Sequence, residues 1–360
     1  MTANVAAPRG IVWQLTYACP LRCVHCYTES GRRPTRQLSR PEQSRVVDAM
    51  ISLEPYEISL GGGEPLIVPG VYELAEQIRA ADVGVSVWTS GWTIGPDLID
   101  PILDSFDAIH VSVDGATAEM HDAIRGRRGS FDRATRALEL LGAGIDDRRR
   151  RGQWVPYLGI DCCVTRSNFG QLRQYCGELL HRFPEVTVAN LDACLPNGLA
   201  SRAGFAEHEL LTEQLCAELT SDELGAELRS LAPRGVTLGL DAYQAWRPSA
   251  DNLQPETGFM EVEADGSVRV YPFLEWTAGS LLTESAAEVW ARVHEYRRDP
   301  FLAEVFASVT DMTGWAVAVR RLDEHFGSGE TQQRIARRPE FIALPAVPAP
   351  AADRHLKEKV

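Results

Sequence analysis

The chain has 360 residues, of which 44% are hydrophobic and 24% are charged, and its formal net charge is −14 at pH 7. A chain of this length and composition can bury a large core, which predicts one large domain and a smaller one. Its acidic balance argues against nonspecific nucleic-acid binding, which requires positive charge. We recognise no secretion signal and no membrane-spanning run, so we expect a cytoplasmic protein that binds neither nucleic acid nor a membrane.

Apolar runs alternate with helix-periodic segments along the first part of the chain. The runs predicted as strands are 11–17, 57–60, 83–89, 108–113, 157–164 and 185–191. The segments predicted as helices are 41–53, 70–81, 96–104, 130–143 and 168–181. Such alternation predicts a parallel sheet with right-handed crossovers, and in parallel barrels functional groups gather at the C-terminal ends of the strands.

Three cysteines, Cys19, Cys23 and Cys26, follow the first predicted strand within eight residues. Closely spaced thiolates favour zinc, copper(I) or an iron–sulfur cluster, and a cluster held by three cysteines leaves one iron free for another ligand. The same spacing also fits one face of a helix, so buried core cysteines remain an alternative. A structural zinc site needs a fourth ligand, for which His25 is poorly placed beside Cys26.

The second strand runs into a glycine segment, Gly61, Gly62 and Gly63, followed by Glu64 and Pro65. The glycines permit positive φ angles and the close approach of a ligand to bare backbone. The carboxylate of Glu64 can accept hydrogen bonds from an ammonium group. A tight turn between strand and helix is the alternative interpretation.

A CxxxCxxC loop after the first strand and a GGGEP segment after the second closely resemble the radical S-adenosylmethionine (radical SAM) superfamily. The resemblance implies that Cys19, Cys23 and Cys26 hold one [4Fe-4S] cluster, whose open iron binds the amino and carboxylate groups of SAM. It also implies that the glycine segment contacts the methionine amino group. His25 stands where the family commonly has an aromatic residue, near the adenine.

Further matches extend the resemblance over residues 11–200. Ser90 lies in a Thr-Ser-Gly run where the family often has Thr-Asn-Gly. Ser112 and Asp114 lie in Ser-Val-Asp-Gly at the end of the fourth strand, and Arg125 lies in the following HDAIRGRRGSFDRA segment. By similarity, Ser112 and Arg125 approach the SAM carboxylate, and Asp114 shapes the same pocket or reaches the ribose. The alternatives are a plain turn at Asp114 and a surface salt bridge at Arg125.

The mechanism that the resemblance implies is reductive cleavage of SAM. A donor such as flavodoxin or ferredoxin supplies one electron, and the resulting 5′-deoxyadenosyl radical abstracts a hydrogen atom from the substrate. The work of the protein is then to place the substrate C–H bond against the radical and to exclude competing donors.

Cys194 follows the sixth strand in NLDACLPNGLA, which resembles the Pro-x-Gly loop of relatives that carry a SPASM domain. A thiol at the barrel mouth can donate a hydrogen atom to a substrate radical, as epimerases of this superfamily require. The alternative is a small buried hydrophobic residue. Cys162 and Cys163 are adjacent on the fifth strand, so at most one of them points into the barrel.

The pattern changes after residue 205. A helical linker, 206–235, leads to short strands at 236–241, 258–263 and 268–272 and to a helix from residue 285. This order resembles a SPASM or Twitch extension, over 236–330. No cysteine follows Cys216, so we expect no auxiliary cluster and favour redox-neutral chemistry.

The outer boundaries are a tail at 1–10, a partial barrel at 11–205 and a C-terminal arm at 331–360 that is poorly ordered or lies over the domain. The arginine run at 148–151 is predicted as a solvated loop. The fold class is therefore α/β, a six-unit (β/α)6 partial TIM barrel with a smaller α+β SPASM-like C-terminal domain.

The function we favour from the sequence is radical SAM tailoring of a carbohydrate-type or aminoglycoside-type natural product by epimerisation, decarboxylation or rearrangement. A maturase or epimerase of a ribosomally made precursor peptide is the alternative within the family. A noncatalytic metal-binding scaffold is the alternative from another class.

Overall fold

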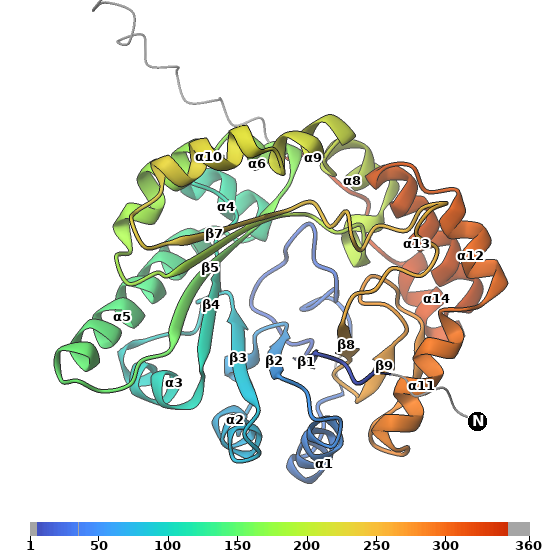
Figure 1. Ribbon diagram of the computed structural model, residues 1–360, viewed down its shortest axis with the longest axis horizontal. Coiled ribbons are helices and arrows are strands. Elements are labelled where there is room, and N and C mark those ends of the chain that lie inside the picture. Colours follow the sequence, from blue (N-terminus) through green and yellow to red (C-terminus); the bar gives the residue numbers. More distant parts are fainter. Residues whose placement is uncertain (1–5, 35, 345–360) are drawn as a thin grey trace, which may run out of the picture.

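Ten strands form one sheet in the part of the chain that the computed structural model describes, residues 6–34 and 36–344. The strand order is β10-β9-β8-β1-β2-β3-β4-β5-β6-β7, and each neighbouring pair from β1 to β7 is parallel. Figure 1 shows these strands as an arc with helices along its outer side. The predicted α/β partial barrel is therefore confirmed.

The parallel strands of the arc correspond closely to the predicted runs. They are β1 (Gly10–Thr16), β2 (Glu57–Gly62), β3 (Gly84–Thr89), β4 (Ala108–Ser112), β5 (Tyr157–Val164), β6 (Val188–Ala193) and β7 (Thr237–Asp241). The helices of this part are α1 (Arg40–Ile51), α2 (Val71–Arg79), α3 (Ile99–Ser105), α4 (Ala118–Arg125), α5 (Ser130–Arg150), α6 (Arg166–Phe169), α7 (Leu172–Gln174), α8 (Ala203–His208), α9 (Glu213–Leu219) and α10 (Asp222–Leu231). Among the described helices, none has both the length and the apolarity to cross a membrane.

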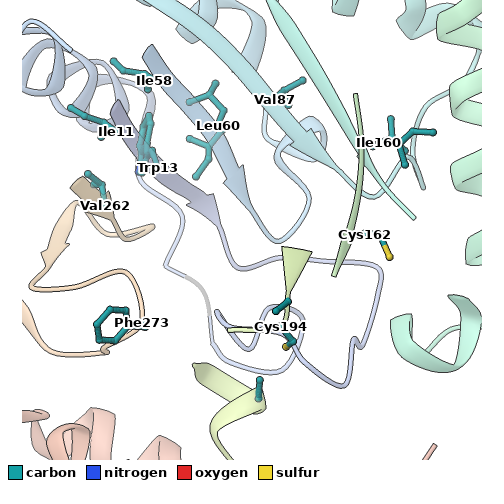
Figure 2. Packing of buried hydrophobic residues seen from close by; sticks show 14 of the residues in the cluster. Ile11, Trp13, Ile58, Leu60, Val87, Ile160, Cys162, Cys194, Val262 and Phe273 are labelled. Carbon is teal, nitrogen blue, oxygen red and sulfur yellow. The ribbon is translucent and has the colours of Figure 1, made fainter. Parts of the chain in front are cut away.

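Alternation along each strand separates a core face from an inner face. Leu60, Val87 and Ile160, on β2, β3 and β5, are fully buried and belong to the apolar cluster drawn in Figure 2. Cys162 belongs to the same cluster, whereas the side chain of Cys163 points to the inner face because successive side chains of a strand alternate. The barrel is thus sealed by apolar side chains on its helical side and lined by more polar ones inside.

The strand predicted at 236–241 lies in the barrel sheet and not in the C-terminal extension. As β7, it pairs in parallel with β6, with Val188 opposite Thr237 and Asp192 opposite Asp241. Leu238 and Leu240 of this strand pack against the core. A sheet edge at β6 would leave the backbone groups of that strand unpaired, and β7 satisfies them.

The C-terminal extension joins the barrel through its first strand. This strand, β8 (Phe259–Val262), pairs in parallel with β1, and β9 (Ser267–Arg269) and β10 (Thr277–Ser280) continue the sheet in antiparallel pairing. The helices of the extension are α11 (Ala286–Tyr296), α12 (Pro300–Ala307), α13 (Met312–Phe326) and α14 (Gly329–Ala336). The SPASM-like unit therefore shares the barrel's sheet.

Two helical predictions differ from the structure. Helix α5 continues through the arginine run that we expected as a loop, because Arg150 pairs with Asp146 one turn earlier and cations are favourable at a helix C-terminus. The segment 168–181 was expected to be a single helix. In the structure it is broken into short helical pieces, including a π-helical turn at Tyr175–Leu179. At this turn the buried hydroxyl of Tyr175 donates a hydrogen bond to the carbonyl of Val113.

Candidate active site

The cysteine loop leaves β1 and is closed by backbone hydrogen bonds. The amide of Gly31 donates to the carbonyl of Tyr17 (2.7 Å), which joins the two ends of the loop. Arg22 and Val24 donate to the carbonyls of Arg125 and Ile124 at the end of α4 (3.1 and 2.9 Å). The loop is therefore anchored to the segment that follows β4.

Each of the three predicted ligand sulfurs has a nearby N–H donor. Backbone amides donate from Leu21 to Cys19 Sγ (3.4 Å) and from Ser30 to Cys26 Sγ (3.3 Å). The guanidinium of Arg125 lies 4.0 Å from Cys23 Sγ. Such donors stabilise negative charge on sulfur, so the donor set fits thiolate ligands of an iron–sulfur cluster.

Burial makes the thiols of Cys19 and Cys23 weaker acids in the chain without metal. It raises the pKa of Cys19 and of Cys23 to about 12, although Arg125 opposes the effect at Cys23. Within residues 6–34 and 36–344, no three His, Cys, Asp or Glu side chains converge as the ligands of one metal ion must. A four-iron cluster makes no such demand, because each thiolate binds a different iron.

The glycine segment packs directly on the chain that enters the cysteine loop. Gly63 donates to the carbonyl of Thr16 (2.6 Å), and Glu64 donates to the carbonyl of Ala18 (2.9 Å). A Cβ atom on Gly63 would lie 2.1 Å from the Ala18 oxygen, and Gly62 has a φ of 115°. At Gly61 the Cβ position is unobstructed, since its nearest neighbour is 3.7 Å away. Packing thus requires Gly62 and Gly63, and Gly61 keeps its inner side open.

Glu64 joins the end of β2 to the end of β3. Its buried carboxylate accepts hydrogen bonds from the Thr89 hydroxyl (2.7 Å), from the amide (3.0 Å) and hydroxyl of Ser90, and from the amide of Leu66 (3.4 Å). Burial raises the pKa of Glu64, and these donors oppose that effect. The predicted site residues Glu64 and Ser90 therefore bind each other, and Pro65 starts a buried 3₁₀ turn beside them.

Asp114 and Arg125 form an ion pair whose facing atoms are buried, with Arg125 Nε 2.5 Å from Asp114 Oδ2; Asp114 is fully buried, and 13% of the Arg125 side chain is exposed. The same carboxylate oxygen lies 3.8 Å from His25 Nε2, and the other accepts the amide of Cys163 (3.0 Å). Burial alone would raise the pKa of Asp114, but Arg125 and His25 hold it below its usual value. Neither the plain turn nor the surface salt bridge considered from the sequence describes this pair.

Two further predicted residues lie at the ends of strands. Ser112 ends β4 and stands opposite Asp161 of β5 in the sheet register. Cys194 directly follows β6, where its amide donates to the carbonyl of Val164 (2.9 Å) and its side chain is buried. Its thiol neighbours that of Cys163, which also contacts His25.

The inner face holds a polar group that includes Trp88 and His110, two residues that motif reasoning alone did not reveal. The indole of Trp88 stacks on the imidazole of His110, with the ring centroids 4.3 Å apart, and His110 Nδ1 lies 2.8 Å from Asp161 Oδ2. Asn190 donates to the other oxygen of Asp161 (2.7 Å). Burial, together with Asp161 and Asp241, raises the pKa of Asp192 to about 7. Strand alternation is the signal that could have found Trp88 and His110, because both occupy inward positions.

A second polar group lies between β1, β8 and the cysteine loop. Gln14 donates to the hydroxyl of Tyr27 and to the carboxylate of Glu261. Burial raises the pKa of Glu261 to about 7. No local pattern marks these residues, because β8 is distant in the sequence and reaches β1 only in the folded sheet.

Comparison with known proteins gives sequence relatives and structural neighbours. The profile of the Radical SAM superfamily matches residues 13–150. The chain is 39% identical to mycofactocin maturase MftC of Mycolicibacterium smegmatis over 320 residues, which cover 84% of this chain and 75% of that protein. It is 36% identical to AdoMet-dependent heme synthase of Methanosarcina barkeri over 318 residues, or 83% of this chain and 87% of that protein.

Solved structures resemble the fold at low sequence identity. Streptococcus suis SuiB bound to precursor peptide SuiA superposes with a TM-score of 0.62 at 12% identity, covering 82% of this chain and 68% of that one. The anSMEcpe protein with bound AdoMet superposes with a TM-score of 0.54 at 17% identity, and the match covers 84% of each chain. Identities this low establish likeness of fold alone.

Replacing Gly63 by alanine is expected to destabilise the fold at the site. The new Cβ would meet the backbone oxygen of Ala18, which cannot rotate away, so we expect a loss of at least about 2 kcal/mol in the free energy of unfolding. Urea denaturation measures this loss. Gly170→Ala is the control, because nothing lies within 4 Å of its Cβ position. Equal stability of the two variants would contradict the packing argument.

Replacing Asp114 by asparagine leaves the buried Arg125 charge without its partner. We expect a loss of about 3 kcal/mol in the free energy of unfolding at pH 7, measured by chemical denaturation. Glu139→Gln, which removes a partner from the exposed pair with Arg136, should cause no measurable change.

The difference in the free energy of unfolding between the unmodified chain and Asp114→Asn is expected to depend on pH. Because the folded-state pKa of Asp114 is lowered, its stabilising effect is present at neutral pH and is lost as the pH falls through that lowered value. The advantage of the unmodified chain over Asp114→Asn should therefore persist down to about pH 4, near the ordinary aspartate pKa, and shrink below it. A stability difference that instead disappears between pH 7 and pH 5 would contradict the lowered pKa of Asp114.

Proposed function

The chain belongs to the radical SAM superfamily, and on this premise we propose that it is a maturase that modifies a ribosomally made precursor peptide through a 5′-deoxyadenosyl radical. The observation that carries the proposal is the similarity to mycofactocin maturase MftC over most of both chains. Membership of this family makes the chain a SAM-dependent enzyme and sets the noncatalytic scaffold aside.

Cys19, Cys23 and Cys26 would hold the [4Fe-4S] cluster that the family implies. With SAM bound, that cluster supplies reductive cleavage of SAM to methionine and the 5′-deoxyadenosyl radical. The open position of Gly61 leaves room for the methionine end of SAM beside β2. Asp114 neutralises the buried charge of Arg125 and orients His25 at the predicted adenine position.

The inner face of the sheet is where we expect the substrate. Asp161, Asp192 and Asp241 lie on β5, β6 and β7 and favour a segment that carries hydrogen-bond donors or positive charge. The relatives reported above support a peptide more than the carbohydrate-type metabolite that the sequence led us to prefer. Ser112, Ser90 and the glycine segment are retained as proposed SAM-site residues.

A tetrapyrrole substrate is the second candidate. The supporting observation is the similarity to AdoMet-dependent heme synthase, which also extends over most of both chains. Both candidates require the same radical, so only the substrate distinguishes them.

We propose one cluster only and an external reductant such as flavodoxin or ferredoxin. No cysteine follows Cys216 in the sequence. In the extension, the rings of Tyr271 and Phe273 stack with their centroids 4.9 Å apart, and Phe273 packs edge-on against Trp315. These buried aromatic side chains fill the interior of the extension. Without a second acceptor of electrons, redox-neutral chemistry such as epimerisation or rearrangement is favoured.

Radical formation is tested by anaerobic reconstitution with iron and sulfide, followed by dithionite and SAM. We expect 5′-deoxyadenosine, detected by mass spectrometry, from the unmodified chain and from Cys176→Ala, and none from Cys23→Ala. Cys176 is buried outside the cysteine loop and serves as the matched control.

The substrate is identified in the same assay with deuterated candidates. A precursor peptide encoded beside the gene should transfer deuterium into 5′-deoxyadenosine, whereas a deuterated tetrapyrrole should not. Transfer from the tetrapyrrole alone would replace the peptide proposal by the second candidate. Absence of 5′-deoxyadenosine with every candidate, from a protein that holds a reducible cluster, would contradict the proposed function.

Cys194 is our proposed hydrogen-atom donor to the substrate radical. Its thiol lies beyond the end of β6, beside Cys163 and close to the cysteine loop through His25. In D₂O the thiol exchanges, so the product of the unmodified enzyme should carry one solvent deuterium. Cys194→Ala should still form 5′-deoxyadenosine but lose this label, and Cys216→Ala should keep it. A labelled product from Cys194→Ala would assign the donor elsewhere.

A further inference from the structure

The C-terminal segment returns to the cysteine loop through buried ion pairs. Arg338 donates from Nε and Nη2 to Glu29 Oε1 (3.0 and 2.8 Å), and Arg334 pairs with the same oxygen. Both arginines also pair with Glu275, which precedes β10. The exposed side-chain fractions are 5% for Glu29, 2% for Glu275 and 5% for Arg338. The four side chains, Glu29, Glu275, Arg334 and Arg338, are called the arginine latch below.

One short segment supplies both arginines of the latch. Arg334 lies in the last turn of α14, and Arg338 lies two residues beyond the end of that helix. Both side chains point to the same side, because each pairs with Glu29 and with Glu275. Figure 1 shows α14 among the helices of the C-terminal extension. The segment thus presents two positive charges to two buried carboxylates, and the charges balance.

Glu29 occupies the turn that follows the third predicted cluster ligand. Its φ is 55°, a left-handed conformation that residues with a Cβ rarely adopt. The amide of Glu29 donates to the carbonyl of Cys26 (3.4 Å), and the next amide, that of Ser30, donates to Cys26 Sγ (3.3 Å). The conformation of Glu29 therefore sets the position of the N–H group that faces the Cys26 sulfur.

The same C-terminal segment also supports the loop after β6. Arg338 Nη1 donates to the Ser201 hydroxyl (3.2 Å), and Arg202 donates to the carbonyl of Pro339 (2.7 Å). Arg202 also donates to the carbonyl of Val24 in the cysteine loop (2.6 Å). In turn, Leu199 donates to the carbonyl of Cys26 (3.0 Å). Cys26 is thus held from two sides by elements that the C-terminal segment contacts.

Buried carboxylates without counter-charges are costly, and Arg338 contacts Glu29 through two nitrogens, so a docked Arg338 stabilises the position of Glu29. We propose that Arg338 and Glu29 are positioning residues for Cys26, and that the docked C-terminal segment completes the cysteine loop. This inference rests on the proposed function in one respect, because it treats Cys26 as a cluster ligand. It adds to that function a role for residues 334–339.

The test uses two charge-balanced double variants of the full chain. Glu29→Gln/Arg338→Gln removes one charge of each sign and breaks the contact to the cysteine loop. Glu275→Gln/Arg334→Gln removes the same charges from the same latch, and with them the Arg334–Glu29 contact, but keeps the two-nitrogen contact between Arg338 and Glu29. Arg337→Gln, at an exposed position next to Arg338, controls for loss of surface charge.

Two rates are followed. The first is iron release to a chelator after anaerobic reconstitution with iron and sulfide, and the second is alkylation of Cys19 and Cys26 by iodoacetamide in the iron-free chain, resolved by peptide mass spectrometry. In Glu29→Gln/Arg338→Gln, we expect both iron release and Cys26 alkylation to accelerate at least about fivefold, with Cys19 alkylation unchanged. The other two variants should keep the wild-type rates.

Wild-type rates in a folded Glu29→Gln/Arg338→Gln variant would overturn the proposal. So would equal acceleration in both double variants, since that would mean a general loss of stability. If Glu29→Gln/Arg338→Gln fails to fold, the single variant Arg338→Lys replaces it, because lysine keeps the positive charge but loses the two-nitrogen contact to Glu29. An intermediate acceleration at Cys26 then supports the proposal, and an unchanged rate rejects it. If the wild-type chain binds no iron, the proposed function fails, while the alkylation rates still decide whether the latch positions Cys26.

Discussion

The buried ion pair between Asp114 and Arg125 joins the segments that must meet at the barrel mouth. Asp114 follows β4 and accepts the amide of Cys163 on β5, while Arg125 ends α4 and approaches Cys23. His25 contacts the same carboxylate. Because an isolated charge cannot remain buried, each partner requires the other, and the loops that carry them are fixed together. The proposed SAM site is therefore built around a pair of charges that cancel.

Backbone packing provides the second constraint on the site. Gly62 and Gly63 lie so close to the chain entering the cysteine loop that side chains are excluded, and Glu64 then ties this segment to Ser90 after β3. The glycine segment thus has a structural task in addition to the SAM contact that the family resemblance implies. The proposed SAM contact and the packing role of this segment are compatible, because the Cβ position of Gly61 is open whereas those of Gly62 and Gly63 are not.

The C-terminal extension contributes to the barrel in two ways. Its strand β8 continues the sheet beside β1 and brings Glu261 to Gln14, and its last described segment places the arginine latch against the cysteine loop. Aromatic packing around Phe273 fills the interior of the extension. Through position and charge, the extension can therefore influence the cysteine loop.

The sequence by itself determined the β/α alternation, and with it the parallel sheet, because periodicity reports local structure directly. It also indicated Cys19, Cys23, Cys26 and the glycine segment as candidate site residues, since these motifs lie within short stretches of chain. Only the tertiary structure decided that β7 belongs to the barrel and that Glu29 meets Arg338. These two residues are 309 positions apart, and an ion pair between distant segments leaves no periodic signal in either. The physical reason is that hydrophobic periods specify which face is buried, whereas the partner of a buried charge is known only once the chain has folded.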